Sequence, residues 1–379
     1  MLVTSDDYRR AAKKRLPRLL FDYIDGGSYA ERTLRANVSD FADVQLRQRV
    51  LNDVSTLNTS VELFGQKLSM PLVLAPIGMG GMFSKRGEVQ AARAAKKAGV
   101  PLCLSTLSIC GIEEVTKAAV APWFQLYVLK DRGYMRALIA RAKQAGCPVL
   151  VFTVDLPVPG ARYRDMRSGL FGGGPSAGFK LAWDGLTHPG WLWDVWLGGR
   201  PNSFSNVVEA VGAKVSFRDF WVWVRENFDP TLNWKDLDWI REAWGGPIVI
   251  KGILDPEDAR QACGLGIDGI VVSNHGGRQL DDVLSGIRAL PPIVDAVAGR
   301  TSILMDGGVR SGLDVMKAMA LGAKACLIGR NWVFASAAQG ERGVANMLNI
   351  MRGELRTAMA LTGCTDVTKA SPEMVTRQS

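Results

Sequence analysis

Short apolar runs alternate with helical patterns along the chain from residue 71 onward. The runs are almost continuously apolar, which is typical of parallel strands that are buried on both faces. Ala-rich and charged segments with helical spacing lie between them, and Gly99, Gly146, Gly266 and Gly322 stand where such helices would end. This pattern predicts an α/β protein with a closed (β/α)8 TIM barrel. The predicted strands are 72–77, 102–106, 123–128, 149–155, 247–252, 269–274, 302–308 and 325–330, and the eighth helix is 343–363.

Two segments fall outside this repeat. Residues 1–65 form an N-terminal segment with helical patterns at 5–22 and 28–37, and residues 168–232 form a long insertion after the fourth strand. We therefore expect a single domain over 1–379, with the barrel in 66–365 and the insertion as a lid or docking surface. The insertion starts with the glycine-rich stretch GLFGGGPSAG and is rich in tryptophan. Those tryptophans fit either a small packed cluster, which we favour, or a membrane interface.

Composition and charge exclude several classes of protein. The 379 residues are 47% hydrophobic and 22% charged, with a net charge of +9 and a basic run between Arg9 and Arg18. The longest charge-free stretch, 68–84, contains prolines and glycines, so we expect no transmembrane helix. We also expect no secretory signal, because the N-terminus has acids and no apolar segment. Two histidines and scattered cysteines argue against a metal site, and no nucleic-acid-binding motif is present.

The predicted carboxyl ends of the strands carry a constellation of polar side chains, which in a barrel is where catalytic groups lie. His275 directly follows the sixth strand, and Arg278 comes three residues later across two glycines. Asp155, at the end of the fourth strand, is placed to orient an imidazole, and Arg162 follows it. A base and a guanidinium facing one cavity suit a substrate with a carboxylate and a reactive α-carbon.

The last two strands predict a phosphate site. Gly307, Gly308 and Gly329 free backbone N–H groups for an anion, and Arg330 is placed to pair with it. Tight turns at strand ends also require glycine and are the alternative explanation. Lys251, at the end of the fifth strand, is either a lysine reaching the rim or a cation beside a developing negative charge.

In order along the chain, the motifs FDYIDGG, APIGM, LSTLS, FQLYV, FTVDLPVPGARYRD, VIKGI, SNHGGRQLD, DGGVRSG and IGR resemble the FMN-dependent α-hydroxy acid oxidase and dehydrogenase family. The resemblance implies an active-site base, His275, and leaves open whether electrons leave as a hydride or from a carbanion. It further implies that Asp155 stabilises the protonated base, that Tyr127 faces the substrate oxygen, and that Tyr23, Arg162 and Arg278 bind the substrate. The cofactor FMN would be held by Pro76, Ile77, Gly78, Ser105, Gln125, Thr153, Lys251, Ser273, Asp306, Gly307, Gly308, Arg310, Gly329 and Arg330.

Within that family, the Trp-rich stretch THPGWLWDVWLGGRP most resembles bacterial members that oxidise L-lactate to pyruvate and reduce a quinone. The resemblance then implies a homotetramer, peripheral on the cytoplasmic side of the inner membrane. Gly78 stands where many oxidases of the family carry Ala, which favours a dehydrogenase, and Leu107 stands where some carry a bulky aromatic residue. The alternatives are another 2-hydroxy acid such as mandelate or glycolate, a non-redox barrel for a phosphorylated metabolite, and a non-catalytic membrane binder.

Overall fold

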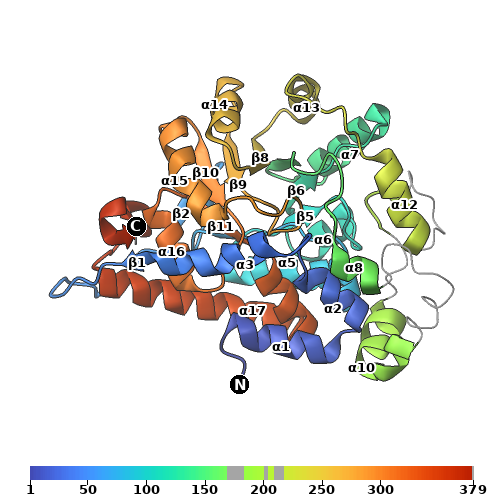
Figure 1. Ribbon diagram of the computed structural model, residues 1–379, viewed down its shortest axis with the longest axis horizontal. Helices are drawn as coiled ribbons and strands as arrows, with labels where there is room; N and C mark the ends of the chain where they lie inside the picture. The colour runs from blue at the N-terminus through green and yellow to red at the C-terminus, as the bar shows by residue number, and fades with distance from the viewer. Residues whose placement is uncertain (169–182, 200–203, 209–216, 378–379) are drawn as a thin grey trace.

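Eight parallel strands form a closed barrel in the computed structural model, which describes residues 1–168, 183–199, 204–208 and 217–377 (Figure 1). The strands pair in the order β4-β11-β10-β9-β8-β7-β6-β5, and a parallel bridge between Leu74 and Leu102 closes the ring. Their residues are almost all buried, as expected when helices cover the outside. The predicted α/β barrel is therefore confirmed. The strands are β4 (Leu72–Leu74), β5 (Cys103–Ser105), β6 (Trp123–Leu126), β7 (Leu150–Thr153), β8 (Ile248–Ile253), β9 (Gly269–Val272), β10 (Ser302–Met305) and β11 (Ala325–Ile328).

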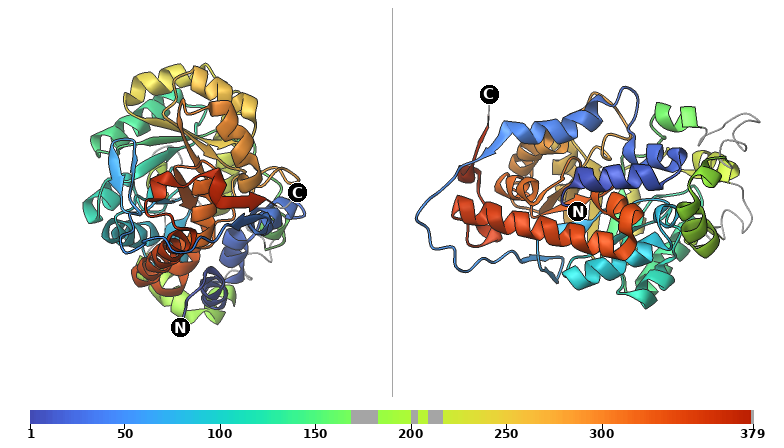
Figure 2. Two further views of the ribbon diagram at one scale, coloured as in Figure 1. Left: turned by 90° about the vertical axis from the view of Figure 1, so that its left-hand side faces the viewer. Right: turned by 90° about the horizontal axis from the view of Figure 1, so that it is seen from below.

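Helices surround the barrel, as the view along it shows (Figure 2). Gly99 ends α5 in the left-handed region with φ 68°, as its position in the sequence predicted. The last helix starts earlier than expected, at Arg330, and residues Gln339 and Gly340 divide it with a kink. The surrounding helices are α5 (Gly87–Ala98), α6 (Ile112–Ala118), α7 (Arg132–Gln144), α13 (Asp236–Trp244), α14 (Pro256–Gly264), α15 (Gly286–Val297), α16 (Gly312–Ala320) and α17 (Arg330–Thr362), with the short α4 (Gly80–Phe83) after β4.

The N-terminal segment packs along the side of the barrel. The predicted helix 5–22 is two helices, α1 (Ser5–Arg15) and α2 (Arg18–Asp25), because Pro17 cannot continue the helical hydrogen bonds. A capping box between Thr4 and Asp7 starts α1, which lies beside α17. The helix predicted at 28–37 is α3 (Arg32–Ser39). The small sheets are β1 (Val44–Leu46) with β12 (Val375–Arg377), and β2 (Val61–Leu63) with β3 (Gln66–Leu68).

Helix α8 (Tyr163–Ser168) leads into the insertion, which contributes α10 (Pro189–Trp191), the π-helical turn η2 (Leu192–Leu197) and α12 (Phe217–Asn227). Trp191 is buried and donates its indole N–H to the carbonyl of Met82, 2.8 Å away. Three other tryptophans are exposed, although the ring of Trp196 lies 6.2 Å from that of Trp191, so the interpretation as one packed cluster holds only in part. They are Trp183, Trp193 and Trp196, exposed by 59%, 76% and 43%. The glycine-rich stretch 169–178 lies outside the described residues.

Gly312, the first residue of α16, allows that helix to approach α17 closely. A Cβ atom at Gly312 would lie 2.2 Å from the backbone nitrogen of Leu355 and 2.3 Å from the carbonyl oxygen of Met351. We therefore expect Gly312→Ala to lower the free energy of unfolding by about 1–3 kcal/mol, because the helices must separate. Urea unfolding measures this loss.

Gly353 provides the matched control, because it also lies in a helix and has open space around its Cα. Gly353→Ala is expected to be neutral or to stabilise by up to about 1 kcal/mol. Equal losses in both variants would show that the close approach at Gly312 does not limit stability.

Candidate active site at the carboxyl ends of the barrel strands

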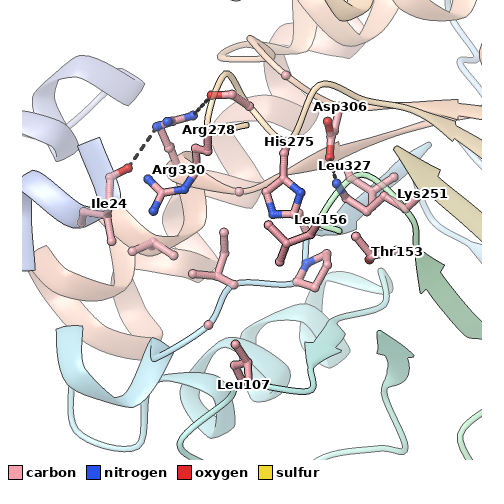
Figure 3. Close-up of a pocket in the computed structure, with 18 of the residues that line it drawn as sticks. Ile24, Leu107, Thr153, Leu156, Lys251, His275, Arg278, Asp306, Leu327 and Arg330 are labelled. Atoms are coloured by element: carbon pink, nitrogen blue, oxygen red, sulfur yellow. Dashed lines mark hydrogen bonds and ion pairs between the residues drawn. The ribbon is translucent and has the colours of Figure 1, made fainter. Parts of the chain in front are cut away.

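A pocket lies at the carboxyl ends of the strands, with an empty volume of about 1190 Å³ that includes space open to solvent. His275 lies between a Lys251–Asp306 pair on one side and the arginines Arg278 and Arg330 on the other (Figure 3). The structure therefore brings together most of the side chains singled out in the sequence. The predicted residues that line the pocket are Tyr23, Pro76, Ile77, Gly78, Tyr127, Thr153, Arg162, Lys251, His275, Arg278, Asp306, Gly307, Gly308, Arg310, Gly329 and Arg330.

His275 is held at both ring nitrogens. Its Nδ1 lies 2.8 Å from Oδ1 of Asp155, and its Nε2 lies 3.3 Å from the hydroxyl of Tyr127. Burial raises the pKa of Asp155, but the charges of His275 and Lys251 outweigh it and lower the pKa below its usual value. Burial raises the pKa of Tyr127 well above its usual range, so its hydroxyl stays protonated. The carboxylate therefore accepts from Nδ1–H, and the lone pair of Nε2 faces the pocket.

The backbone at His275 is strained. His275, Gly276 and Gly277 have φ values of 57°, 65° and 72°, three left-handed residues in succession. Gly277 must be glycine for a second reason, because a Cβ there would lie 2.6 Å from the backbone nitrogen of Leu34. This turn directs both His275 and Arg278 into one pocket.

Two guanidinium groups face the aromatic ring of Tyr23. The Cζ atom of Arg278 lies 4.6 Å from the ring centroid, and that of Arg162 lies 5.8 Å from it. Burial and the neighbouring charge of Arg162 lower the pKa of Arg278. Nη2 of Arg278 is buried and has no hydrogen-bond partner among the described residues. This end of the pocket therefore favours a carboxylate, which would satisfy the guanidinium groups.

Lys251 is buried beside Asp306 and Ser273. Its Nζ lies 2.9 Å from Oδ2 of Asp306 and donates to the hydroxyl oxygen of Ser273, also at 2.9 Å. Burial lowers the pKa of Lys251, but the carboxylates of Asp306 and Asp155 more than offset it and raise the pKa. Lys251 is therefore a fixed cation on the pocket wall, and the alternative of a lysine that reaches the rim is wrong.

Arg330 also makes structural contacts that the sequence did not predict. Its guanidinium donates to the carbonyl oxygens of Ile24, Gly276 and Gly26, at 3.0, 2.9 and 2.7 Å. Burial and the nearby charges of Arg278 and Arg310 lower its pKa to about 9. Arg330 therefore joins the N-terminal segment to the His275 loop, and it also adds positive charge to the pocket.

Positive charge also gathers at the glycine turn after β10. Gly307 and Gly308 have φ values of 86° and 88° there, and Arg310 follows on the same turn. Burial lowers the pKa of Arg310. Cations and glycine backbone at one end of the pocket favour a phosphate group.

Four predicted residues lie behind the pocket wall. The Asp155 carboxylate accepts from His275, and the Ser273 hydroxyl accepts from Lys251 and from the backbone N–H of His275. Gln125 is fully buried, and its Oε1 accepts from the hydroxyl of Ser105 at 3.1 Å. Nε2 of Gln125 and the hydroxyl of Thr153 have no hydrogen-bond partner among the described residues. The Thr153 hydroxyl borders the pocket and the Gln125 amide lies behind its wall, so both retain hydrogen-bonding capacity that suits a flat, polar heterocycle.

The apolar part of the pocket was largely missed in the sequence. Val224 and Phe228 come from α12 and its end, and the Phe228 ring lies 5.2 Å from that of Tyr127. Strand-end positions alone do not reveal them, because they belong to the insertion. The apolar lining residues are Ile24, Ala75, Leu107, Leu156, Pro159, Val224, Phe228, Val309, Leu327, Ile328 and Val333.

A model of the FMN-dependent dehydrogenase family matches residues 12–377. The chain is 58% identical over 365 residues to an L-lactate dehydrogenase of Caulobacter sp. (strain K31), covering 96% of each chain. It is 57% identical over 375 residues to an L-lactate dehydrogenase of Haemophilus influenzae (strain PittEE), covering 98% of each. It is 55% identical over 379 residues to that of Alcaligenes faecalis, covering 100% of each.

Two solved structures share the fold over the whole chain. The monotopic membrane protein (S)-mandelate dehydrogenase superposes with a TM-score of 0.92 at 34% identity, covering 100% of both chains. A mandelate oxidase superposes with a TM-score of 0.83 at 39% identity, covering 100% of this chain and 99% of the other. Among the described residues, no helix combines the length and the apolar composition needed to span a bilayer.

The crowded arginines predict that an anion stabilises the cofactor-free protein. Inorganic phosphate should raise the thermal midpoint at pH 7, because it neutralises Arg310 and Arg330. Folding lowers the pKa of Arg330 from its usual value to about 9. The free-energy cost of burying its charge is therefore complete below pH 9 and decreases as the pH rises through 9. The stabilisation by phosphate should therefore decline above pH 9.

Thermal unfolding with phosphate, and with sodium chloride at the same ionic strength, measures this effect. Arg310→Gln should lose most of the response to phosphate. An equal shift with sodium chloride would contradict a specific anion site.

Proposed function

Because the chain belongs to the FMN-dependent dehydrogenase family, we propose that it oxidises L-lactate to pyruvate and passes the electrons to a membrane quinone. The observation that carries the proposal is the lone pair of His275 Nε2 facing the same pocket as Arg278 and Arg162. The L-lactate dehydrogenases at 55–58% identity support this substrate. The mandelate enzymes among the solved structures are 34–39% identical, and they make another 2-hydroxy acid the alternative.

The arginines would bind and orient the substrate. Arg278 and Arg162 would pair with its carboxylate, which supplies a hydrogen-bond partner for Nη2 of Arg278 and adds negative charge beside Arg162, whose Nη1 already lies 3.7 Å from Oδ2 of Asp165. The Tyr23 hydroxyl adds a hydrogen bond to that carboxylate. This places the α-carbon and its hydroxyl beside His275 and Tyr127, whose side chains are already in contact.

His275 would be the catalytic base. Its Nε2 accepts one of the two protons that leave L-lactate, and Asp155, 2.8 Å from Nδ1, stabilises the imidazolium that forms. The Tyr127 hydroxyl, freed from Nε2, donates to the substrate oxygen. FMN, when bound, would supply the acceptor for the two electrons and the second proton. Pyruvate, the proton on His275 and an acceptor reduced by two electrons and one proton therefore balance the oxidation.

The pocket fits FMN in charge and in polarity. Arg310, Arg330 and the backbone at Gly307, Gly308 and Gly329 would hold the phosphate, since this end gathers buried cations. Lys251 would lie beside the ring system as a fixed cation, with Asp306 and Ser273 holding its ammonium group. The partnerless atoms of Gln125 and Thr153, with Ser105 and the backbone at Pro76, Ile77 and Gly78, would hold the ring edge.

The electron acceptor would be reached at a membrane surface. The described part of the insertion exposes apolar side chains, and Arg15 of the basic α1 pairs with Asp194 beside them at 2.5 Å. Exposed tryptophans next to a basic helix suit an anionic lipid surface. We propose peripheral attachment on the cytoplasmic side of the inner membrane and a homotetrameric assembly. The exposed apolar residues, here called the Trp surface, are Trp183, Leu186, Trp193, Trp196 and Leu197.

The base assignment predicts that His275→Gln keeps the yellow FMN spectrum and lowers turnover by about 10²–10⁴-fold, because no group at that place accepts the proton. The wild-type spectrum should bleach on anaerobic addition of L-lactate and recover with quinone. His188→Gln is the matched control, since these are the two histidines of the sequence, and it should keep full activity.

The outcomes separate the parts of this proposal. Near-wild-type turnover in His275→Gln would refute the base. Bleaching by mandelate or glycolate, with none by L-lactate, would replace the substrate and keep the site.

The Trp surface predicts that Trp193→Ser with Trp196→Ser weakens binding to vesicles of anionic phospholipid and leaves turnover with a soluble acceptor unchanged. Co-sedimentation with the vesicles measures the binding. Val50→Ser with Leu51→Ser is the control, because both side chains are exposed. They follow β1 in the sequence, and β1 lies on the opposite side of the molecule from α10 (Figure 1). Equal vesicle binding in wild type and both double variants would refute a docking role.

A further inference from the structure

Helix α3 is joined to the His275 loop by two asparagines. Nδ2 of Asn37 donates to Oδ1 of Asn274 at 2.9 Å, and Nδ2 of Asn274 donates back to Oδ1 of Asn37 at 2.8 Å. The two residues are 1% and 4% exposed, and 236 residues separate them in the chain. Such a reciprocal amide pair, shielded from water, fixes the two side chains relative to each other.

Asn274 also braces the turn that carries the base. Its Oδ1 accepts from the backbone N–H of Gly277 at 3.0 Å, across the left-handed residues His275 and Gly276. Its Nδ2 also donates to the carbonyl of Leu284 at 3.0 Å. Hydrogen bonds of this kind offset the cost of three successive left-handed residues.

Asn37 also contacts the glycine turn at the proposed phosphate end. A Cβ at Gly308 would lie 1.7 Å from the carbonyl oxygen of Asn37, and one at Gly307 would lie 3.1 Å from Oδ1 of Asn37. Oδ1 of Asn37 also accepts from the backbone N–H of Gly286, at the start of α15. One side chain of the N-terminal segment therefore lies against both functional loops.

We propose that Asn37 and Asn274 are a positioning pair that couples the Gly307–Gly308 turn, which holds the cofactor phosphate, to the turn that holds His275. This inference rests on the proposed function for the roles of the two turns. Neither asparagine lines the pocket, so the pair acts through the backbone of the two loops. Loss of the pair should loosen cofactor binding and base orientation together.

Asp281, in the loop after β9, offers a matched control that contacts the same helix. Its carboxylate accepts from the backbone N–H groups of Arg32 and Thr33, at 3.2 and 2.7 Å, and so holds the start of α3 to the loop after β9. Among the described residues, the Asp281 carboxylate makes no hydrogen bond or ion pair with His275, Gly307 or Gly308. Its loss should loosen the first turn of α3 and leave Asn37, in the last turn, and the two glycine-containing turns in place.

The test compares Asn37→Asp and Asn37→Ser with Asp281→Ala in the FMN-loaded protein. Asn37→Asp has the shape of asparagine but turns the donor at Nδ2 into an oxygen facing Oδ1 of Asn274. We expect FMN to dissociate about tenfold faster in both Asn37 variants, as for one lost buried hydrogen bond. Amide hydrogen exchange should accelerate by a similar factor in 273–279 and in 306–310.

A spectroscopic readout reports the orientation of the base. In protein with ¹⁵N-labelled histidine, His188→Gln identifies the signals of His275. Wild type should show the form protonated at Nδ1, and the Asn37 variants should show mixed tautomers. Asp281→Ala should accelerate exchange in 30–36, with the dissociation of FMN and the signals of His275 unchanged.

Other outcomes would overturn the proposal. These are a change in one turn without the other, no change in either, or the same changes in Asp281→Ala. If the Asn37→Asp variant does not fold, Asn37→Ser provides the test. Since no measurement uses a substrate, a failure here is distinct from an error about L-lactate, and an error about FMN would appear as a wild-type protein without a flavin spectrum.

Discussion

The structure depends on holding several cations in one buried pocket. Arg278, Arg310, Arg330 and Lys251 come from four different strand ends, and burial works against the charge of each. Of these four, and within the part of the chain that the structure describes, only Lys251 has a carboxylate within 3 Å, on Asp306. Unpaired buried charge is costly, so such a pocket favours anionic ligands. A cofactor phosphate and a substrate carboxylate would each supply negative charge, at two separate ends of the pocket. The positions of the cations would therefore set the orientation in which cofactor and substrate bind.

The barrel and most of the pocket were predictable because a parallel barrel places all strand ends at one face. Lys251 and Asp155 lie at the ends of predicted strands and His275 directly follows one, so their meeting was implied by the topology alone. The contacts that hold them were not predictable. The bonds of Arg330 to Ile24 and Gly26 depend on how the N-terminal segment packs, and no periodicity encodes that packing. The Asn37–Asn274 pair was missed for the same reason.

The insertion shows a different limit of the sequence. Trp191 and Trp193 are two residues apart, yet the first is buried with its N–H bonded to Met82 and the second is 76% exposed. A tryptophan-rich sequence alone therefore does not show which tryptophans pack the insertion against the barrel and which remain on its surface. The helical pattern at 5–22 is confirmed as the two helices α1 and α2, and Pro17 divides them.

Arg330 has a consequence for how the chain becomes an enzyme in the cell. It starts the last barrel helix, and its partners Ile24 and Gly26 precede the first barrel strand. During synthesis, the N-terminal helices therefore leave the ribosome long before the residues that hold them exist. Barrel units can pair as they emerge, but the pocket closes only after nearly all of the protein has been made. Only a complete chain can then bind the cofactor. A nascent or truncated chain leaves α1 and α2 exposed to chaperones and proteases.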